Sequence, residues 1–256
     1  MTNNNWVLIT GASSGIGEAF VELYALQNRN IILVSRDKKA LNEVAKRVQQ
    51  KSAIKTKVIA CDLSAPKRVK QLCAQLDAEK LQIDVLINNA GFGDYDEVKD
   101  ADAAKLAAML NVNIAAVTHL AQWAAKHMAK RQSGGILNVA SIAAFLPGPR
   151  MATYYASKAY VLSFTEALAY ELRPYNINVS ALCPGPTQSK FASTANVKGG
   201  LFARKLPTAE QVAKFGIRAL ERNKTVAVHG SSRLVLPLLR LVPRKVAVKI
   251  AARANS

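Results

Sequence analysis

Short runs rich in Val, Ile and Leu recur along the whole chain, and longer segments with helical periodicity separate them. The runs are WVLIT (6–10), IILVS (31–35), KVIA (57–60), DVLIN (84–88), GILNVA (135–140), INVSALC (177–183) and TVAVHG (225–230). Segments such as GEAFVELYALQ and KALNEVAKRVQQ carry apolar residues at helical spacing. Parallel strands need crossover helices and are covered on both faces, so this alternation predicts a single α/β domain over residues 1–256. We expect a doubly wound, Rossmann-type parallel sheet of about seven strands with helices on both faces.

The bulk properties fit one such domain. The chain has 256 residues, half of them hydrophobic, which is enough for a substantial core. Its start, MTNNNWVLIT, lacks the basic and apolar regions of a signal peptide, and Pro237 and Arg240 interrupt the longest apolar run near its end. Three widely spaced cysteines, Cys61, Cys73 and Cys183, form no metal-binding pattern. We therefore expect a cytoplasmic protein with reduced, mostly buried thiols, no bound metal and no transmembrane helix.

A glycine-rich turn, TGASSGIG at 10–17, directly follows the first predicted strand and leads into a helix. Glycines let a backbone approach a ligand closely, and a helix N-terminus offers free N–H groups to a phosphate. Gly11, Gly15 and Gly17 have the spacing GxxxGxG, which departs from the common GxGxxG fingerprint. We interpret the turn as the pyrophosphate site of a dinucleotide, with a plain strand-to-helix turn as the alternative.

The end of the second predicted strand favours NADP(H). In folds of this kind an acid at that point binds the ribose 2′-OH of NAD, whereas an Arg accommodates the 2′-phosphate of NADP. Ser35 stands where the acid would select NAD, and Arg36 follows it. Asp37 carries the competing interpretation, because a one-residue change in the strand end would bring its acid nearer the ribose. A solvated Arg36 is the second alternative.

The segment YYASKAY at 154–160 places two tyrosines before a lysine in a segment with helical character. Side chains four residues apart share a helix face, so Tyr154 and Lys158 point into the same space and Tyr155 is rotated away. An ammonium beside a phenol favours the phenolate. We therefore expect Lys158 to lower the pKa of Tyr154 towards a value useful for proton transfer, with a chance pairing and a solvated lysine as the alternative.

Taken in order, these motifs resemble the classical short-chain dehydrogenase/reductase family up to about residue 190. TGASSGIG is similar to the family's TGxxxGxG loop, CDLS has Asp62 where the family contacts adenine, and NNAG matches its structural motif. NVASIAA and YYASK resemble its catalytic Ser and YxxxK segments, and PGP resembles its turn beside the nicotinamide. The resemblance implies an NADP(H)-binding domain. The residues implied to bind the cofactor are Gly11, Ser13, Ser14, Gly15, Ile16, Gly17, Arg36, Asp62, Leu63, Asn89, Ala90, Gly91, Tyr154, Lys158, Pro184, Gly185 and Thr187.

The same resemblance implies carbonyl reduction by hydride transfer. Tyr154 would act as general acid, and as general base in the reverse direction, while Ser141 would polarise the carbonyl. Lys158 would lower the pKa of Tyr154 and bind the nicotinamide ribose. Asn113 in LNVNIAA would hold a water for proton relay, and Asn111 is its competitor in that segment. A non-catalytic NADP-binding sensor of the same fold is the alternative, although such a relative would normally lack the Tyr or the Lys.

Substrate recognition is implied in the loop after the catalytic Ser and in residues 187–256, the predicted substrate-side loop and basic C-terminal segment. Apolar residues there predict a hydrophobic or acyl-type ketone or aldehyde, with packing in the core as the alternative for some of them: Phe145, Leu146, Met151, Phe191, Leu201 and Phe202. Arg150, Lys190, Arg204 and Lys205 either steer an anionic substrate such as an acyl thioester carrier or are simply solvated. Ser189 keeps a hydroxyl where the family often has Thr.

The net charge of +18 is concentrated near the C-terminus, where residues 197–256 contain 13 Lys or Arg against Glu210 and Glu221. No nucleic-acid-binding motif accompanies this charge, so we expect no specific nucleic-acid partner. The basic C-terminal segment would pack in a homo-oligomer (a dimer or a tetramer), cover the substrate pocket, or make peripheral membrane contact. His119, His127 and His229 are scattered and are interpreted as structural or surface residues.

Overall fold

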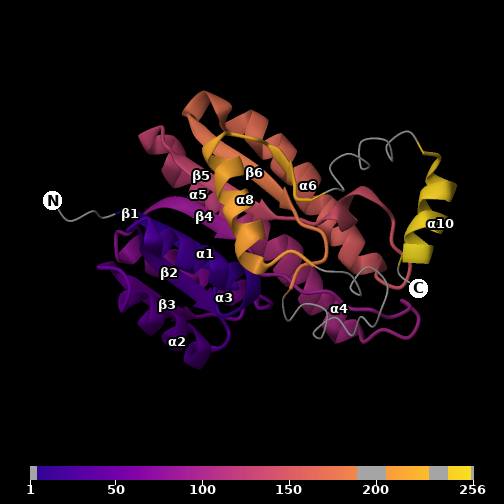
Figure 1. Cartoon of the computed structure of the whole chain (residues 1–256), viewed down its shortest axis with the longest axis horizontal. Coiled ribbons are helices and arrows are strands. Elements are labelled where there is room, and N and C mark those ends of the chain that lie inside the picture. The colour runs from indigo at the N-terminus through magenta and orange to yellow at the C-terminus, as the bar shows by residue number, and fades with distance from the viewer. Residues whose placement is uncertain (1–4, 189–205, 231–241, 255–256) are drawn as a thin grey trace.

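Seven parallel strands form one sheet in the order β3-β2-β1-β4-β5-β6-β7 (Figure 1). The structure is a computed structural model that describes residues 5–188, 206–230 and 242–254. The strands are β1 (Asn5–Thr10), β2 (Asn30–Ser35), β3 (Thr56–Ala60), β4 (Gln82–Asn88), β5 (Gly134–Val139), β6 (Ile177–Cys183) and β7 (Val226–Val228). The doubly wound sheet is confirmed, and each predicted strand lies within two residues of the observed one.

Helices cover both faces of the sheet. The α-helices are α1 (Gly15–Leu26), α2 (Lys38–Gln49), α3 (Pro66–Ala78), α4 (Ala103–Leu110), α5 (Val117–Arg131), α6 (Ala152–Leu172), α8 (Ala209–Glu221) and α10 (Arg244–Ala254). Strand side chains alternate between faces: Trp6 and Leu8 of β1 join the core beneath α3, α5 and α6, whereas Val7 and Ile9 join the core beneath α1, α2 and α8. Burial on both faces explains why the strands read as continuous apolar runs.

A six-residue π-helical segment, η1 (Asn111–Ala116), joins α4 and α5 into one helical stretch. Such π segments within α-helices occur frequently at functional sites. By length and composition alone, the stretch Ala103–Arg131 is the one helix among the described residues that could cross a membrane. Its α5 part packs against β4 and β5, as the core helix of one sheet face does.

The strand order reverses between β1 and β4. The chain moves outward from β1 through β2 to β3, then returns to the other side of β1 for β4 and continues outward to β7. The loops after β1 and β4 therefore leave the same carboxyl edge side by side, at the point where ligands bind in open α/β sheets. Thr10 Oγ1 accepts hydrogen bonds of 3.0 Å from the backbone N–H groups of both Asn89 and Ala90, which ties the two loops together.

Candidate active site

The glycine loop after β1 is shaped for close backbone approach. Gly11 has φ +65°, and a Cβ on Gly17 would lie 2.1 Å from the Gly11 carbonyl oxygen. Asn89 fixes the loop from the β4 side, since its Nδ2 donates to the carbonyl oxygens of Thr10 at 3.0 Å and Gly11 at 3.3 Å. The glycine loop thus has no space for side chains where a dinucleotide pyrophosphate would lie. Gly11 and Gly17 therefore fit that group.

The first turn of α1 keeps its donors available. Ser14 is the N-cap residue, and its side chain makes no capping hydrogen bond to the helix. The first N–H groups of a helix have no partner within the helix, and its dipole favours an anion there. Ser13 and Ile16 are half-buried on the same loop. The N-terminus of α1 can therefore bind a phosphate, as the sequence predicts.

At the adenosine end, the structure separates Arg36 from Asp37. β2 ends at Ser35, as predicted, and Asp37 is the N-cap of α2, accepting a 3.0 Å hydrogen bond from the Ala40 N–H. Arg36 is exposed and close enough to Asp62 to contribute to lowering the pKa of that carboxyl, after the larger effect of two hydrogen bonds from Ser64. Asp37, the acid that would compete for the ribose, is thus engaged in capping the N-terminus of α2.

Ser141, Tyr154 and Lys158 converge at the carboxyl edge of the sheet and are all at least nine-tenths buried. Ser141 directly follows β5, while Tyr154 and Lys158 lie one turn apart on α6. Lys158 Nζ donates a 2.7 Å hydrogen bond to the Val139 carbonyl oxygen at the end of β5 and lies 5.9 Å from the centroid of the Tyr154 ring. The predicted catalytic residues are therefore brought together by the β5–α6 packing.

Burial decides the protonation of this cluster. Desolvation raises the pKa of Tyr154 to about 12, although a hydrogen bond with Ser141 acts in the opposite direction. Desolvation also lowers the pKa of Lys158 to about 8. The predicted net lowering of the Tyr154 pKa is therefore wrong, because the cost of a buried phenolate exceeds the stabilisation that its neighbours provide. At neutral pH Tyr154 is a phenol with a proton to donate.

The structure distinguishes Asn113 from its competitor. Asn113, in the π segment, is fully buried; its side-chain amide donates to the Phe92 carbonyl oxygen and to Ser157 Oγ, both at 3.0 Å. Gly91 lies between Asn113 and Lys158, since a Cβ there would be 3.1 Å from Asn113 Oδ1 and 3.2 Å from Lys158 Nζ. Asn111 instead donates to the Ser64 carbonyl oxygen at 2.9 Å. Asn113 is the asparagine next to the catalytic cluster.

The loop after β6 closes the other side of the cluster. Pro184 offers its carbonyl oxygen to the Ile142 N–H at 3.0 Å and to Ser141 Oγ at 3.5 Å. Thr187 is buried, and its hydroxyl donates to the Gly185 carbonyl oxygen at 2.9 Å. The predicted turn residues thus lie beside Ser141.

The ring of Tyr155 meets the ring of Tyr154 edge-on, with 6.2 Å between the two centroids. The Tyr155 ring covers Gly148, where a Cβ would lie 2.5 Å from three ring carbons. Tyr154 joins an apolar cluster with Met109, Ala143 and Met151, against which Phe92, Tyr95, Leu106 and Tyr155 pack. Of the predicted substrate walls, Met151 belongs to this cluster, whereas Phe145 packs with a different one. Arg150 is exposed, and its guanidinium donates to the Tyr95 hydroxyl at 3.1 Å.

Some predicted residues fall on parts of the chain that the structure does not describe. Those are Ser189, Lys190, Phe191, Leu201, Phe202, Arg204 and Lys205. Leu146 is described and is half-buried, and Leu63 is buried in the core beneath α3 and α5.

Several residues that position the site are not evident from the sequence motifs. Ser157 links Tyr154 to Asn113: its hydroxyl donates to the Tyr154 carbonyl oxygen at 2.7 Å and accepts from Asn113. A buried chain of amides lies deeper, where Asn88 Nδ2 donates to Asn138 Oδ1 at 2.9 Å and Asn138 Nδ2 donates to Thr165 at 3.0 Å. Polar residues inside otherwise apolar strands were the available signal, because a buried polar group needs a partner.

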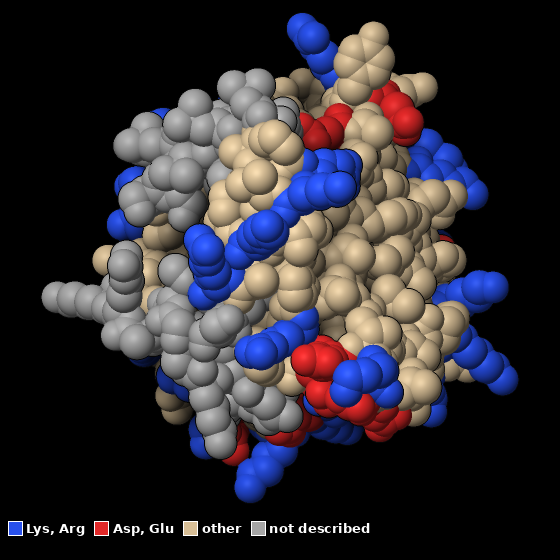
Figure 2. Space-filling model, turned by 90° about the vertical axis from the view of Figure 1, so that its right-hand side faces the viewer, with Lys and Arg blue, Asp and Glu red and all other residues tan. Residues whose placement is uncertain are grey.

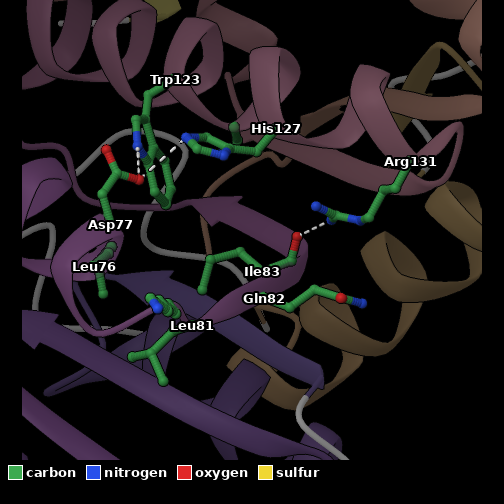
Figure 3. A pocket seen from close by; sticks show the side chains of 10 residues that line it. Leu76, Asp77, Leu81, Gln82, Ile83, Trp123, His127 and Arg131 are labelled. Carbon is green, nitrogen blue, oxygen red and sulfur yellow. Dashed lines mark hydrogen bonds and ion pairs between the residues drawn. The ribbon is translucent and has the colours of Figure 1, made fainter.

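A pocket of about 320 Å³ lies at the start of β4, at the sheet edge opposite Ser141, Tyr154 and Lys158 (Figure 3). Asp77 Oδ1 accepts a 3.0 Å hydrogen bond there from Trp123 Nε1 and lies 3.1 Å from His127 Nε2. Arg131 donates to the Ile83 carbonyl oxygen. Because these polar groups bind one another, nothing in the pocket points to a ligand, and His127 has the structural role predicted for it.

The surroundings of His229 and of the three cysteines also indicate structural roles. His229 packs edge-on against Phe215, and burial lowers its pKa. Cys61, Cys73 and Cys183 are free and buried, as predicted. Within residues 5–188, 206–230 and 242–254, no three His, Cys, Asp or Glu side chains come close enough to hold a metal.

The buried Lys158 leads to a first prediction, on stability. Its pKa falls from 10.5 to about 8 on folding, so between these pH values the unfolded chain binds more protons and stability rises with pH. Lys158→Met removes this dependence. We expect the wild-type free energy of unfolding to rise relative to that of the variant by about 2–3 kcal/mol between pH 7 and pH 10, from 1.36 kcal/mol per pKa unit. Urea unfolding across this pH range measures the free-energy difference. Lys126→Met changes a lysine on the exposed side of α5, and its stability should follow that of the wild type. A free-energy difference between the wild type and Lys158→Met that stays constant with pH would contradict the prediction.

Comparison with known proteins agrees with this arrangement. The family model "short chain dehydrogenase" matches residues 5–198. Hydroxysteroid dehydrogenase-like protein 1 of Gallus gallus is 33% identical over 223 residues, which are 86% of this chain and 66% of that protein. The very-long-chain 3-oxoacyl-CoA reductase of Mus musculus is 29% identical over 243 residues, covering 91% of this chain and 75% of that protein.

A solved structure has the same fold. The short-chain dehydrogenase from Sphingobium yanoikuyae, in complex with NADPH, superposes with a TM-score of 0.84 and 29% identity, covering 93% of this chain and 94% of the other. The family match spans the glycine loop, the NNAG segment and the predicted catalytic residues Ser141, Tyr154 and Lys158. The chain belongs to the short-chain dehydrogenase family.

Proposed function

We propose that the protein is an NADPH-dependent reductase of hydrophobic or acyl-type ketones or aldehydes. The observation that carries this proposal is the buried convergence of Ser141, Tyr154 and Lys158 beside a glycine cradle. Burial excludes water, and it keeps a protonated phenol next to a hydroxyl donor.

In the proposed mechanism a substrate carbonyl enters between Ser141 and Tyr154. NADPH, when bound, supplies the hydride. The Ser141 hydroxyl hydrogen-bonds the carbonyl oxygen as negative charge develops there, and Tyr154 donates its proton to that oxygen. A phenol whose pKa is about 12 is fully protonated at neutral pH, which suits the reductive direction. After Tyr154 has donated its proton, a new proton would reach it along a path formed by Lys158 and Asn113.

The preference for NADPH rests on the exposed Arg36 and on the capping role of Asp37. The Sphingobium yanoikuyae relative in complex with NADPH supports the same choice. Arg36→Ala would remove a cation from the 2′-phosphate, and charge-assisted hydrogen bonds of this kind are strong. We expect the KM for NADPH to rise roughly 10–100-fold, with little change in the KM for NADH.

Steady-state kinetics with both cofactors measures this effect. Lys51→Ala is the matched control, because Lys51 is an exposed cation beyond the far end of α2. An equal rise for NADPH and NADH would contradict a role for Arg36 in choosing between them.

The apolar cluster around Tyr154 supports a hydrophobic substrate. Met109 and Met151 are buried in it, and Phe92 and Leu106 pack against them. The Mus musculus relative is named for very-long-chain 3-oxoacyl-CoA, which is an acyl ketone. We therefore place ketones carried on an acyl thioester first among the substrates to be tested, ahead of simple hydrophobic ketones and aldehydes.

The experiment that tests the proposed function follows the loss of NADPH absorbance with this substrate panel, with NADH in parallel. Turnover that prefers NADPH is expected. Binding of NADPH without turnover on any substrate would favour a non-catalytic sensor instead.

We also propose that the protein is a homo-oligomer. Tyr160 and Tyr170 on α6 are 40% and 82% exposed, and Leu110 at the end of α4 is 41% exposed. Exposed aromatic and aliphatic side chains provide contact area for a second subunit. Light scattering coupled to size exclusion measures the mass in solution.

A further inference from the structure

The C-terminal helix α10 has one buried face. Ala247 and Ala251, four residues apart, are 6% and 1% exposed and lie on the same face of the helix. The opposite side of the helix faces solvent, so its composition decides what it can contact.

That outward side combines cations with aliphatic side chains. The exposed cations are Arg244, Lys245, Lys249 and Arg253. Three exposed aliphatic residues flank them: Val246 at 45%, Val248 at 38% and Ile250 at 39%. A soluble helix normally turns its Val and Ile inward. Here the inward positions are alanines, and the larger apolar side chains lie beside the cations.

The C-terminal part of the sequence, which contains α10, carries charge of a single sign. Residues 222–256 contain eight Lys or Arg and no Asp or Glu. Figure 2 views the molecule from the side on which α10 lies in Figure 1, and a row of Lys and Arg side chains crosses the middle of this face. The acidic side chains lie above and below that row. This surface therefore attracts an anionic partner that also accepts aliphatic groups.

We propose that α10 docks the protein on anionic phospholipid membranes. A basic helix with exposed aliphatic residues lies in the plane of the lipid headgroups, with the aliphatic side chains entering the acyl boundary and the cations binding the headgroups. The eleven residues of α10 span only about 16 Å and carry four charges, so the helix lies on the membrane and does not cross it.

Other occupants fit this face less well. A second copy of the chain would place the same acid-free, eight-cation segment against itself, and like charges repel. The phosphates of a nucleic acid would pair with Lys245 and Lys249. They would leave the aliphatic side chains of Val246, Val248 and Ile250 exposed beside them. A lipid surface accepts both kinds of side chain.

Vesicle flotation with the full chain tests the proposal. Vesicles of phosphatidylcholine alone are compared with vesicles containing about 30% phosphatidylserine, at low salt and at about 0.5 M NaCl. We expect binding to the anionic vesicles only, weakened by salt. Lys245→Glu with Lys249→Glu should lower the partition coefficient roughly 30-fold or more, and Val246→Ser with Ile250→Ser about tenfold.

The matched control is Lys126→Glu with Lys130→Glu, two exposed lysines with the same spacing on α5, which should bind vesicles like the wild type. Thermal unfolding checks that every variant is folded. Equal binding to both kinds of vesicle, or anionic binding that the α10 variants do not change, would overturn the proposal. So would an absence of vesicle binding together with salt-dependent binding to a DNA duplex. No readout requires turnover, so this proposal and the proposed function fail separately.

Discussion

Replacing Tyr154 by Phe is expected to lower kcat for carbonyl reduction roughly 10²–10⁴-fold, the range that positioned acid catalysis supplies. The substitution removes one hydroxyl and keeps the ring, so the apolar cluster with Met109 and Met151 stays packed. It also removes the buried phenol, whose pKa burial raises to about 12 and which holds the proton to be transferred. Single-turnover and steady-state rates with NADPH measure the loss, and fluorescence titration should show an NADPH Kd within a few-fold of the wild-type value.

The neighbouring tyrosine is the matched control. Tyr155→Phe makes the same chemical change one residue away, in a ring that packs over Gly148. Its kcat should remain within about threefold of the wild-type value, because it takes no part in proton transfer. If Tyr154→Phe kept more than about a tenth of the wild-type rate, or if both variants lost activity equally, the assignment of the acid to Tyr154 would be untenable.

Gly17→Ala is expected to have the largest effect on cofactor binding. An added Cβ would lie 2.1 Å from the Gly11 carbonyl oxygen and 2.5 Å from Asn89 Nδ2, well inside contact distance. The glycine loop or Asn89 must move, and forced packing of this kind costs about 1–3 kcal/mol. Because the same loop would hold the pyrophosphate, we expect the NADPH Kd to rise about 100-fold and the free energy of unfolding to fall by about 2–3 kcal/mol.

The steric part of this prediction has its own control. A Cβ on Gly185 would meet only Ile142 Cδ1, at 3.6 Å, which is ordinary van der Waals contact. Gly185→Ala should therefore unfold in urea close to the wild-type midpoint. Unchanged stability and NADPH affinity in Gly17→Ala would show that the loop is looser than its backbone contacts imply.

Much of the fold followed from local patterns. The apolar runs predicted all seven strands, because β-strands buried on both faces tolerate few polar residues. The glycine spacing predicted a phosphate-binding loop, and the four-residue spacing selected Tyr154 over Tyr155. Each of these inferences depends on geometry within one helix or one turn, which covalent structure fixes over a few residues.

Other features depended on contacts between distant segments. The family resemblance favours Asn113 over Asn111, but only the packing of the π segment against the loop at Phe92 shows that Asn113 lies beside Lys158. Met109 and Phe92 became neighbours of Tyr154 through the same packing. No local spacing encodes such contacts, since they arise from the order in which strands assemble.

The sequence by itself determined which residues recur at helical and strand spacing, and hence the sheet, the glycine loop and the pairing of Tyr154 with Lys158. Only the tertiary structure decided the protonation of that pair and the outward face of α10. The sequence predicted a lowered pKa for Tyr154 from its charged neighbour, whereas the folded protein raises it. The physical reason is that desolvation depends on how completely surrounding elements exclude water, and this exclusion exists only after the chain has packed.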